Sequence, residues 1–91
     1  MDFEWDEGKR ARVLRERGVD LVRAARIFRG HVLVEADRRR EYGEDRYIAI
    51  GEADGEYFVV AFTHRGQKIR LITAWRAGER ARTAYQERFP G

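Results

Sequence analysis

The chain contains no cysteine, a single proline and no long hydrophobic run. Without cysteine it forms neither a disulfide nor a thiolate metal site, which fits a reducing compartment. No apolar stretch approaches the ~20 residues that a membrane-spanning helix needs. The first residues are acidic and lack the basic start and apolar stretch of a signal peptide. The sequence therefore predicts a cytoplasmic protein without a membrane segment.

Lysine is also scarce, since it occurs only as Lys9 and Lys68 in a chain of net charge +3. Arginine thus supplies almost all of the positive charge, and its planar guanidinium suits bidentate contacts with phosphate. A GC-rich genome that prefers arginine codons explains the same bias. Phosphate recognition additionally requires the arginines to cluster in space.

The 91 residues, of which 43% are hydrophobic, predict a single domain over residues 1–91. Its α+β pattern has the order β-α-α-β-β-β-β-α. Asp6 and Asp20 are expected helix N-caps, and Gly18 is expected to end the first helix. Hairpins flanked by helices favour an antiparallel sheet with the helices packed on one face. The strands are expected at 3–5, 31–37, 46–52, 57–64 and 68–75, and the helices at 7–17, 21–29 and 79–88.

Turn residues set the register of the sheet. Asp54-Gly55 is a strong two-residue hairpin signal, and Arg65-Gly66 is a weaker one. These turns predict that Phe62 pairs with Ile69. They also predict one uncharged face that buries helices, formed by Tyr47, Ala49, Phe58, Val60, Phe62, Ile69 and Leu71.

The opposite face is expected to change from apolar to basic toward the Arg65 turn. Phosphate binding at the basic end, or pairing with Glu41 and Glu44 of the preceding loop, offsets the repulsion between its like charges. An exposed apolar row is typical of an interface. The expected apolar row is Ile50, Val59 and Ile72, and the rows after it are Ile48, Ala61 and Arg70, then Arg46, Thr63 and Lys68.

Five stretches of the chain together resemble the BrnT family of bacterial toxins. The opening motif and the Arg-Gly-x-x-Ile-Arg pattern are fairly specific in combination. The stretches are Phe3-Glu4-Trp5-Asp6-Glu7-Gly8-Lys9, Gly18-Val19-Asp20, Ala24-Ala25-Arg26-Ile27-Phe28, Arg46-Tyr47-Ile48-Ala49-Ile50-Gly51, and Thr63-His64-Arg65-Gly66 with Ile69-Arg70.

The resemblance implies a RelE-like fold and a metal-independent ribonuclease toxin that cleaves mRNA and inhibits translation. It further implies a BrnA-like ribbon-helix-helix antitoxin that neutralises the toxin. The two proteins would co-repress their operon, with operator DNA contacted only through the antitoxin.

Metal-independent RNA cleavage needs a base, an acid and cations around the phosphate. Lys9 matches the basic position after the opening motif of the family, Arg65 is expected at a hairpin tip, and His64 is of a residue type that often serves as a general acid or base. The expected catalytic residues are Lys9, His64, Arg65, Arg70 and Arg76. The expected RNA-binding residues are Arg46, Lys68, Arg80 and Tyr42.

No metal and no cofactor are expected. The acidic pair Glu35/Asp37 has no third ligand at a suggestive spacing, and Glu52/Asp54 runs into a turn. The chain also has no glycine-rich phosphate-binding motif.

Two other functions stay open, because the chain departs from the family pattern at Arg17, Trp75 and Ala81. The first is a non-catalytic binding module for nucleic acid or an acidic protein. The second is a structural partner of a ribbon-helix-helix repressor, which would depend on the apolar row of the second face.

Overall fold

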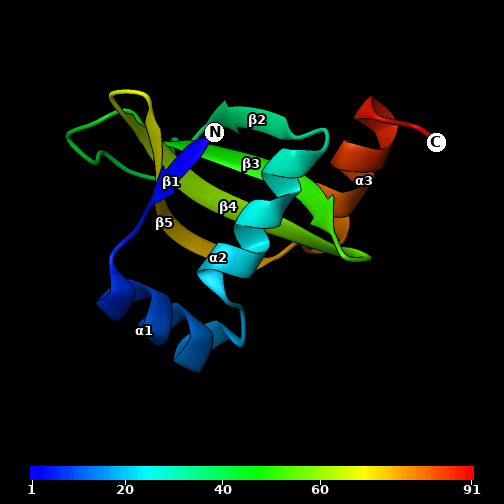
Figure 1. The fold of residues 1–91 in the computed structure, drawn as a ribbon. Coiled ribbons are helices and arrows are strands. Elements are labelled where there is room, and N and C mark those ends of the chain that lie inside the picture. Colours follow the sequence, from blue (N-terminus) through cyan, green and yellow to red (C-terminus); the bar gives the residue numbers. More distant parts are fainter.

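The computed structural model describes residues 1–91 and contains one five-stranded sheet and three α-helices (Figure 1). The strands are β1 Asp2–Glu4, β2 Leu33–Ala36, β3 Tyr47–Ala53, β4 Glu56–Arg65 and β5 Lys68–Arg76. The helices are α1 Glu7–Arg17, α2 Leu21–Ala24 and α3 Glu79–Arg88. The expected α+β class is confirmed, with small shifts at the ends of the elements.

The second expected helix is only partly an α-helix. After α2 the chain continues as the 3-10 helix η1, Ala25–Arg29. The amide of Gly30 donates to the carbonyl of Ile27 at 3.2 Å, which is the tighter bonding that often closes a helix. None of the helices has the length and apolar character that a membrane crossing needs.

The sheet is mixed, in the order β1-β5-β4-β3-β2. The strands from β2 to β5 are antiparallel to their neighbours, but β1 runs parallel to β5, with Asp2 opposite Lys68. The expectation of a purely antiparallel sheet is therefore wrong at this edge. No hairpin turn joins β1 to β5, so nothing in the local sequence fixes their relative direction.

The β3–β4 hairpin has the expected turn and register. Asp54 and Gly55 both adopt positive φ, 53° and 81°, which matches the twist of a two-residue hairpin. Ala49 pairs with Val60 as expected. The strong turn signal therefore fixed this pair of strands.

The β4–β5 hairpin differs from the expected one. Arg65 pairs with Lys68, so the loop is Gly66-Gln67 and not Arg65-Gly66. Gly66 has φ 61° and takes the first loop position, where a left-handed conformation suits glycine.

The new loop changes the partners of β4. Phe62 pairs with Leu71, not with Ile69, and a bulge follows because Ala61 pairs with Thr73. The register therefore shifts by two residues near the turn, which preserves the faces there. The bulge inserts Ile72 and changes the register by one more residue.

The face expected to bury helices is confirmed as the main core. It packs under α2 and η1, where Leu21 and Ile27 are fully buried. The buried members from the sheet are Ala49, Ala53, Phe58, Val60, Phe62, Ile69, Leu71 and Ala74.

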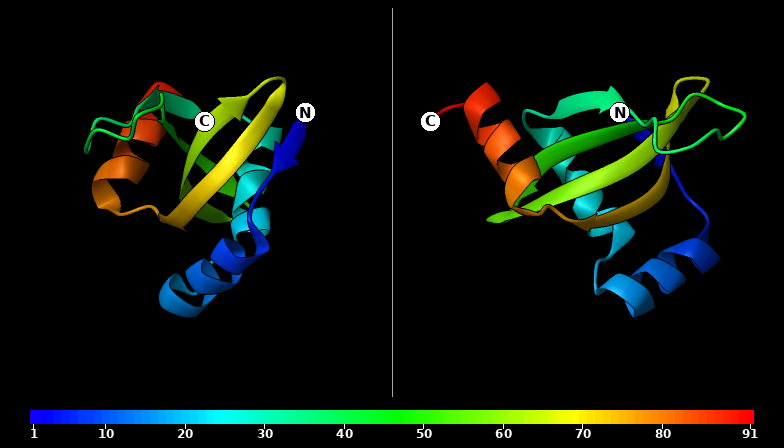
Figure 2. Two further views of the ribbon diagram at one scale, coloured as in Figure 1. Left: turned by 90° about the vertical axis from the view of Figure 1, so that its left-hand side faces the viewer. Right: turned by 180° about the vertical axis from the view of Figure 1, so that it is seen from behind.

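The opposite face carries α3, so the expectation that all helices pack on one face is wrong. Figure 2 shows α2 and α3 on opposite sides of the sheet. The Tyr57 ring meets Tyr85 of α3 at 5.7 Å between centroids, and the Tyr85 hydroxyl donates to the carbonyl of His31 at 3.0 Å. Ile50 and Val59 of this face are buried.

Candidate functional site: a basic pocket between α1 and the 37–46 loop

A hollow of about 490 Å³ lies where α1 and the 37–46 loop meet β5. Six cationic side chains and one carboxylate line it, so its surface is strongly positive. We call it the basic pocket. Its lining is Lys9, Arg12, Val13, Glu16 and Arg17 from α1, Arg39, Arg40, Tyr42 and Arg46 from the loop, and Ile72 and Thr73 from β5.

Helix α1 presents one face to the basic pocket. Lys9, Arg12 and Glu16 follow one another at spacings of three and four residues, which places them on one side of a helix. Val13 lies between them and is buried, so it anchors this side against the sheet. The helix begins at Asp6, whose carboxylate accepts from the amide of Gly8 at 2.9 Å.

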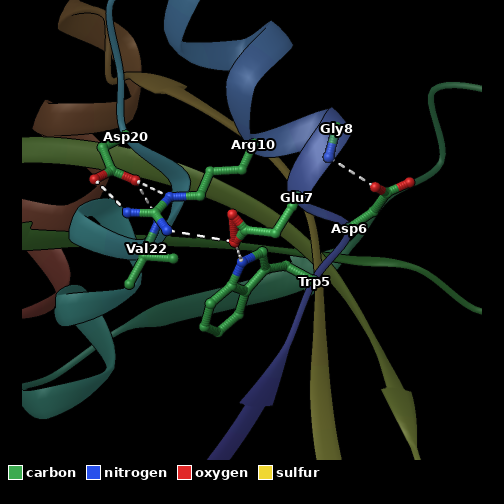
Figure 3. Close-up of polar contacts among 7 residues, drawn as sticks. All are labelled: Trp5, Asp6, Glu7, Gly8, Arg10, Asp20 and Val22. Carbon is green, nitrogen blue, oxygen red and sulfur yellow. Dashed lines mark hydrogen bonds and ion pairs between the residues drawn. The ribbon is translucent and has the colours of Figure 1, made fainter.

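Arg10 fixes the rotation of α1 about its axis (Figure 3). Its guanidinium donates to both carboxylate oxygens of Asp20, at 2.9 and 3.1 Å, and to Glu7 at 3.4 Å. Glu7 also accepts from the indole of Trp5. Asp20 caps α2, so this network ties α1 to α2 and leaves Lys9 on the side of the pocket.

Asp37 holds the first part of the loop in place. Its side chain is 1% exposed and accepts from Arg39 through Nε at 2.8 Å and Nη2 at 2.7 Å. The hydrogen bonds from Arg39 lower the pKa of Asp37 from 3.8 to about 2. The Arg39 guanidinium is thereby held at a fixed place in the pocket wall.

Trp75 of β5 joins the loop to α1. The guanidinium of Arg39 lies 4.9 Å from the centre of its ring, and that of Arg17 lies 5.3 Å away. Both contacts are cation–π interactions. On the other side of the loop, Arg46 lies 4.1 Å from the centre of the Tyr42 ring.

The cations of the basic pocket outnumber their acidic partners. Arg39 pairs with Asp37 and Arg46 with Glu44 at 3.2 Å. The remaining four, Lys9, Arg12, Arg17 and Arg40, make no ion pair.

Partial burial lowers the pKa of Lys9, and the nearby charges of Arg46, Arg12 and Arg70 lower it further. A group of unpaired positive charges that includes a lysine of lowered pKa is typical of a functional site that binds an anion.

Three of the sequence-predicted site residues line the pocket, namely Lys9, Tyr42 and Arg46. Arg70 lies close enough for its charge to lower the pKa of Lys9, and its guanidinium pairs with Glu4 at 2.9 Å. The expected row of Arg46, Thr63 and Lys68 is wrong, because Thr63 pairs with Arg70 in the observed register.

The other predicted site residues lie outside the lining. Arg65 and Lys68 pair at the hairpin tip. His64 contacts the rings of Tyr47 and Phe62, at 5.6 Å from each, on the face opposite the pocket.

Arg76 and Arg80 are also away from the basic pocket. Arg76 pairs with Glu56 at 3.3 Å, and Arg80 lies on α3 in a separate shallow hollow with Glu79 and Glu87. No group of three or more His, Asp or Glu side chains gathers as metal ligands would.

Five charged lining residues were not among the sequence-predicted site residues: Arg12, Glu16, Arg17, Arg39 and Arg40. For the members on α1, the signal was the spacing from Lys9 along one helical face. For Arg39 and Arg40 no local pattern existed, because only the folded loop brings them beside α1.

Comparison with known families gives one match over most of the chain. The model described as the ribonuclease toxin, BrnT, of type II toxin–antitoxin systems matches residues 5–80. The matched segment includes every residue that lines the basic pocket. A comparison with individual curated proteins gives no match.

Proposed function

Because the chain belongs to the BrnT family of ribonuclease toxins of type II toxin–antitoxin systems, we propose that it cleaves mRNA in the basic pocket and thereby inhibits translation. The observation that carries the proposal is the gathering of six cationic side chains, four of them without acidic partners, around one hollow. Such a site neutralises a phosphodiester and the extra negative charge of its transition state.

The proposed reaction is an internal transfer at phosphorus. A base takes the proton of the ribose 2′-hydroxyl, the 2′-oxygen attacks the phosphorus, and the bond to the 5′-oxygen breaks. The arginines stabilise the charge on the phosphate oxygens, and Lys9 donates a proton to the departing 5′-oxygen. The lowered pKa of Lys9 favours that donation, and no step requires a metal ion.

Flanking nucleotides are proposed to follow the sheet from the pocket to the hairpin tip. Arg70 of β5 lies near Lys9 of α1. Arg65 of β4 and Lys68 of β5 pair at the hairpin tip. These three side chains are proposed to bind RNA rather than to take part in the chemistry. Tyr42 also lines the pocket, and its aromatic ring is proposed to stack on a base.

The family also implies an RNA substrate and an antitoxin partner. We propose that the antitoxin is a BrnA-like ribbon-helix-helix protein that neutralises the toxin. In this proposal the pair represses its own operon in the cytoplasm, with operator DNA bound only by the antitoxin. Kinship with RelE-type toxins belongs to the same proposal and is supported by the α+β fold.

The test is incubation of purified, antitoxin-free protein with RNA, with and without EDTA. We expect cleavage in both conditions and a loss of about 10²-fold or more in Lys9→Ala, the usual contribution of a proton-transfer group. Arg80→Ala is the control, because Arg80 is cationic but lies outside the pocket.

Equal cleavage by wild type and Lys9→Ala contradicts this site, and loss of cleavage in EDTA contradicts metal independence. RNA binding without cleavage favours the non-catalytic binding module instead.

A further inference from the structure

Glu16 is the only carboxylate that lines the basic pocket. It lies on the same face of α1 as Lys9 and Arg12, one turn after Arg12 and two turns after Lys9. Despite these cationic neighbours, it makes no ion pair within 4.0 Å. Its oxygens are therefore free to accept a proton from a bound molecule.

Four other acidic side chains near the pocket are already engaged, while Glu41 and Asp45 of the loop line a separate hollow. Asp37 accepts from Arg39, Glu44 from Arg46, and Glu4 from Arg70. Asp20 is taken up by Arg10 in the contact between α1 and α2. Each of these four carboxylates has a structural partner, whereas Glu16 has none.

Neither histidine is a base for this pocket. His64 lies on the opposite face of the sheet against aromatic rings, and His31 stacks on Phe89 at 5.0 Å. A base for the 2′-hydroxyl has to come from the lining itself. Among the lining side chains, only Glu16 carries a carboxylate, whose oxygens can accept a proton.

Resting on the function proposed above, we propose that Glu16 is the general base of RNA cleavage. Its carboxylate removes the 2′-hydroxyl proton as the 2′-oxygen bonds to phosphorus. The bond from phosphorus to the 5′-oxygen breaks, and that oxygen takes a proton from Lys9. The products are a 2′,3′-cyclic phosphate and a free 5′-hydroxyl, so atoms and charges balance after proton exchange with water.

The spacing on α1 suits this division of roles. Glu16 lies seven positions after Lys9, which is about 10 Å along a helix axis that rises 1.5 Å per residue. Both side chains are long, so their end groups can reach a phosphodiester held between them. The arginines of the loop face the same space from the other side.

The proposal separates catalysis from binding in a single variant, Glu16→Gln. The amide keeps the size of the side chain but cannot take the proton, so we expect kcat to fall by about 10²-fold. It also removes the one negative charge from a cationic pocket, so RNA is expected to bind as tightly or more tightly. Fluorescence binding to a non-cleavable 2′-deoxy analogue and steady-state kinetics measure the two effects.

Glu87→Gln is the matched control, because Glu87 is an exposed carboxylate on α3, away from the pocket. It should keep wild-type kcat and binding. Circular dichroism verifies that each variant is folded. Glu16→Asp keeps the carboxylate on a shorter side chain and should recover part of the activity that Glu16→Gln loses.

Wild-type kcat in Glu16→Gln overturns the assignment of the base. Weaker binding with unchanged kcat also overturns it, because that result describes a binding residue. In both cases the loss of activity in Lys9→Ala leaves the proposed nuclease function intact. Absence of cleavage by the wild-type protein overturns the proposed function and this inference together.

Discussion

Asp37 is the residue that organises the 37–46 loop, and replacing it with asparagine is expected to lower stability. The amide keeps the shape but leaves the Arg39 guanidinium without its carboxylate at 2.7 Å. Loss of a buried charged hydrogen-bond partner costs about 1–3 kcal/mol. Urea denaturation of wild type and Asp37→Asn measures the change in the free energy of unfolding.

The same residue predicts how stability depends on pH. The folded-state pKa of Asp37 is about 2, below its ordinary value of 3.8. Its contribution is therefore fully present above about pH 4 and is lost as the pH falls toward 2. In Asp37→Asn this part of the acid dependence should be absent. Identical loss of stability in both proteins between pH 4 and pH 2 would contradict the assignment.

At the scale of single residues, the sequence predicted those lining residues of the basic pocket that lie in or next to a local motif. Lys9 came from the opening motif, and Tyr42 and Arg46 came from the polar loop and the strand that follows it. Arg39 and Arg40 could not be placed, because their position depends on the long-range contact of the loop with Trp75. Glu16 lies on the same helical face as Lys9, but this spacing alone does not distinguish it from other charged residues of α1.

Among the secondary-structure elements, the contact between β3 and η1 depends on a glycine. A Cβ added at Gly51 would lie 2.8 Å from Cβ of Ile27 and 3.2 Å from Cγ1 of Val32. Ile27 is fully buried and cannot move aside freely. Gly51→Ala is therefore expected to cost about 1–3 kcal/mol through overpacking, measured as a lower thermal midpoint.

Gly30→Ala is the control for this change. Gly30 has φ −118°, which any residue adopts, and nothing lies within 4 Å of an added Cβ. Its stability should stay close to that of the wild type. A Gly51→Ala protein as stable as Gly30→Ala would show that η1 does not pack tightly against β3 in solution.

The two hairpins show how far turn residues determine register. Asp54-Gly55 offers two residues that adopt positive φ, so one loop position was favoured and the prediction was confirmed. Around Gly66 only one residue prefers positive φ, so loops beginning at residue 65 or 66 were both possible. The bulge at Ile72 has no strong local signal, since neither glycine nor proline marks it.

For the molecule as a whole, local patterns predicted the composition of the layers better than their arrangement. The core face was identified correctly from alternation along three strands. The parallel pairing of β1 with β5 was not predicted, nor was the position of α3 on the face of the sheet opposite α2. Both follow from contacts between distant segments. The basic pocket is itself such a long-range product, as it joins α1, a loop and the last strand.

The charge distribution of the molecule predicts a salt-dependent affinity for single-stranded RNA. Each phosphate neutralised contributes about −0.7 to the slope of log affinity against log salt. Arg12 lines the pocket without an ion pair, so Arg12→Ala should reduce the steepness of the slope by about 0.7. Arg76→Ala should leave the slope unchanged, because Glu56 already pairs with Arg76. Binding titrations of a 2′-deoxy analogue at several salt concentrations measure both slopes, and equal reductions would mean that RNA does not distinguish the pocket from the rest of the surface.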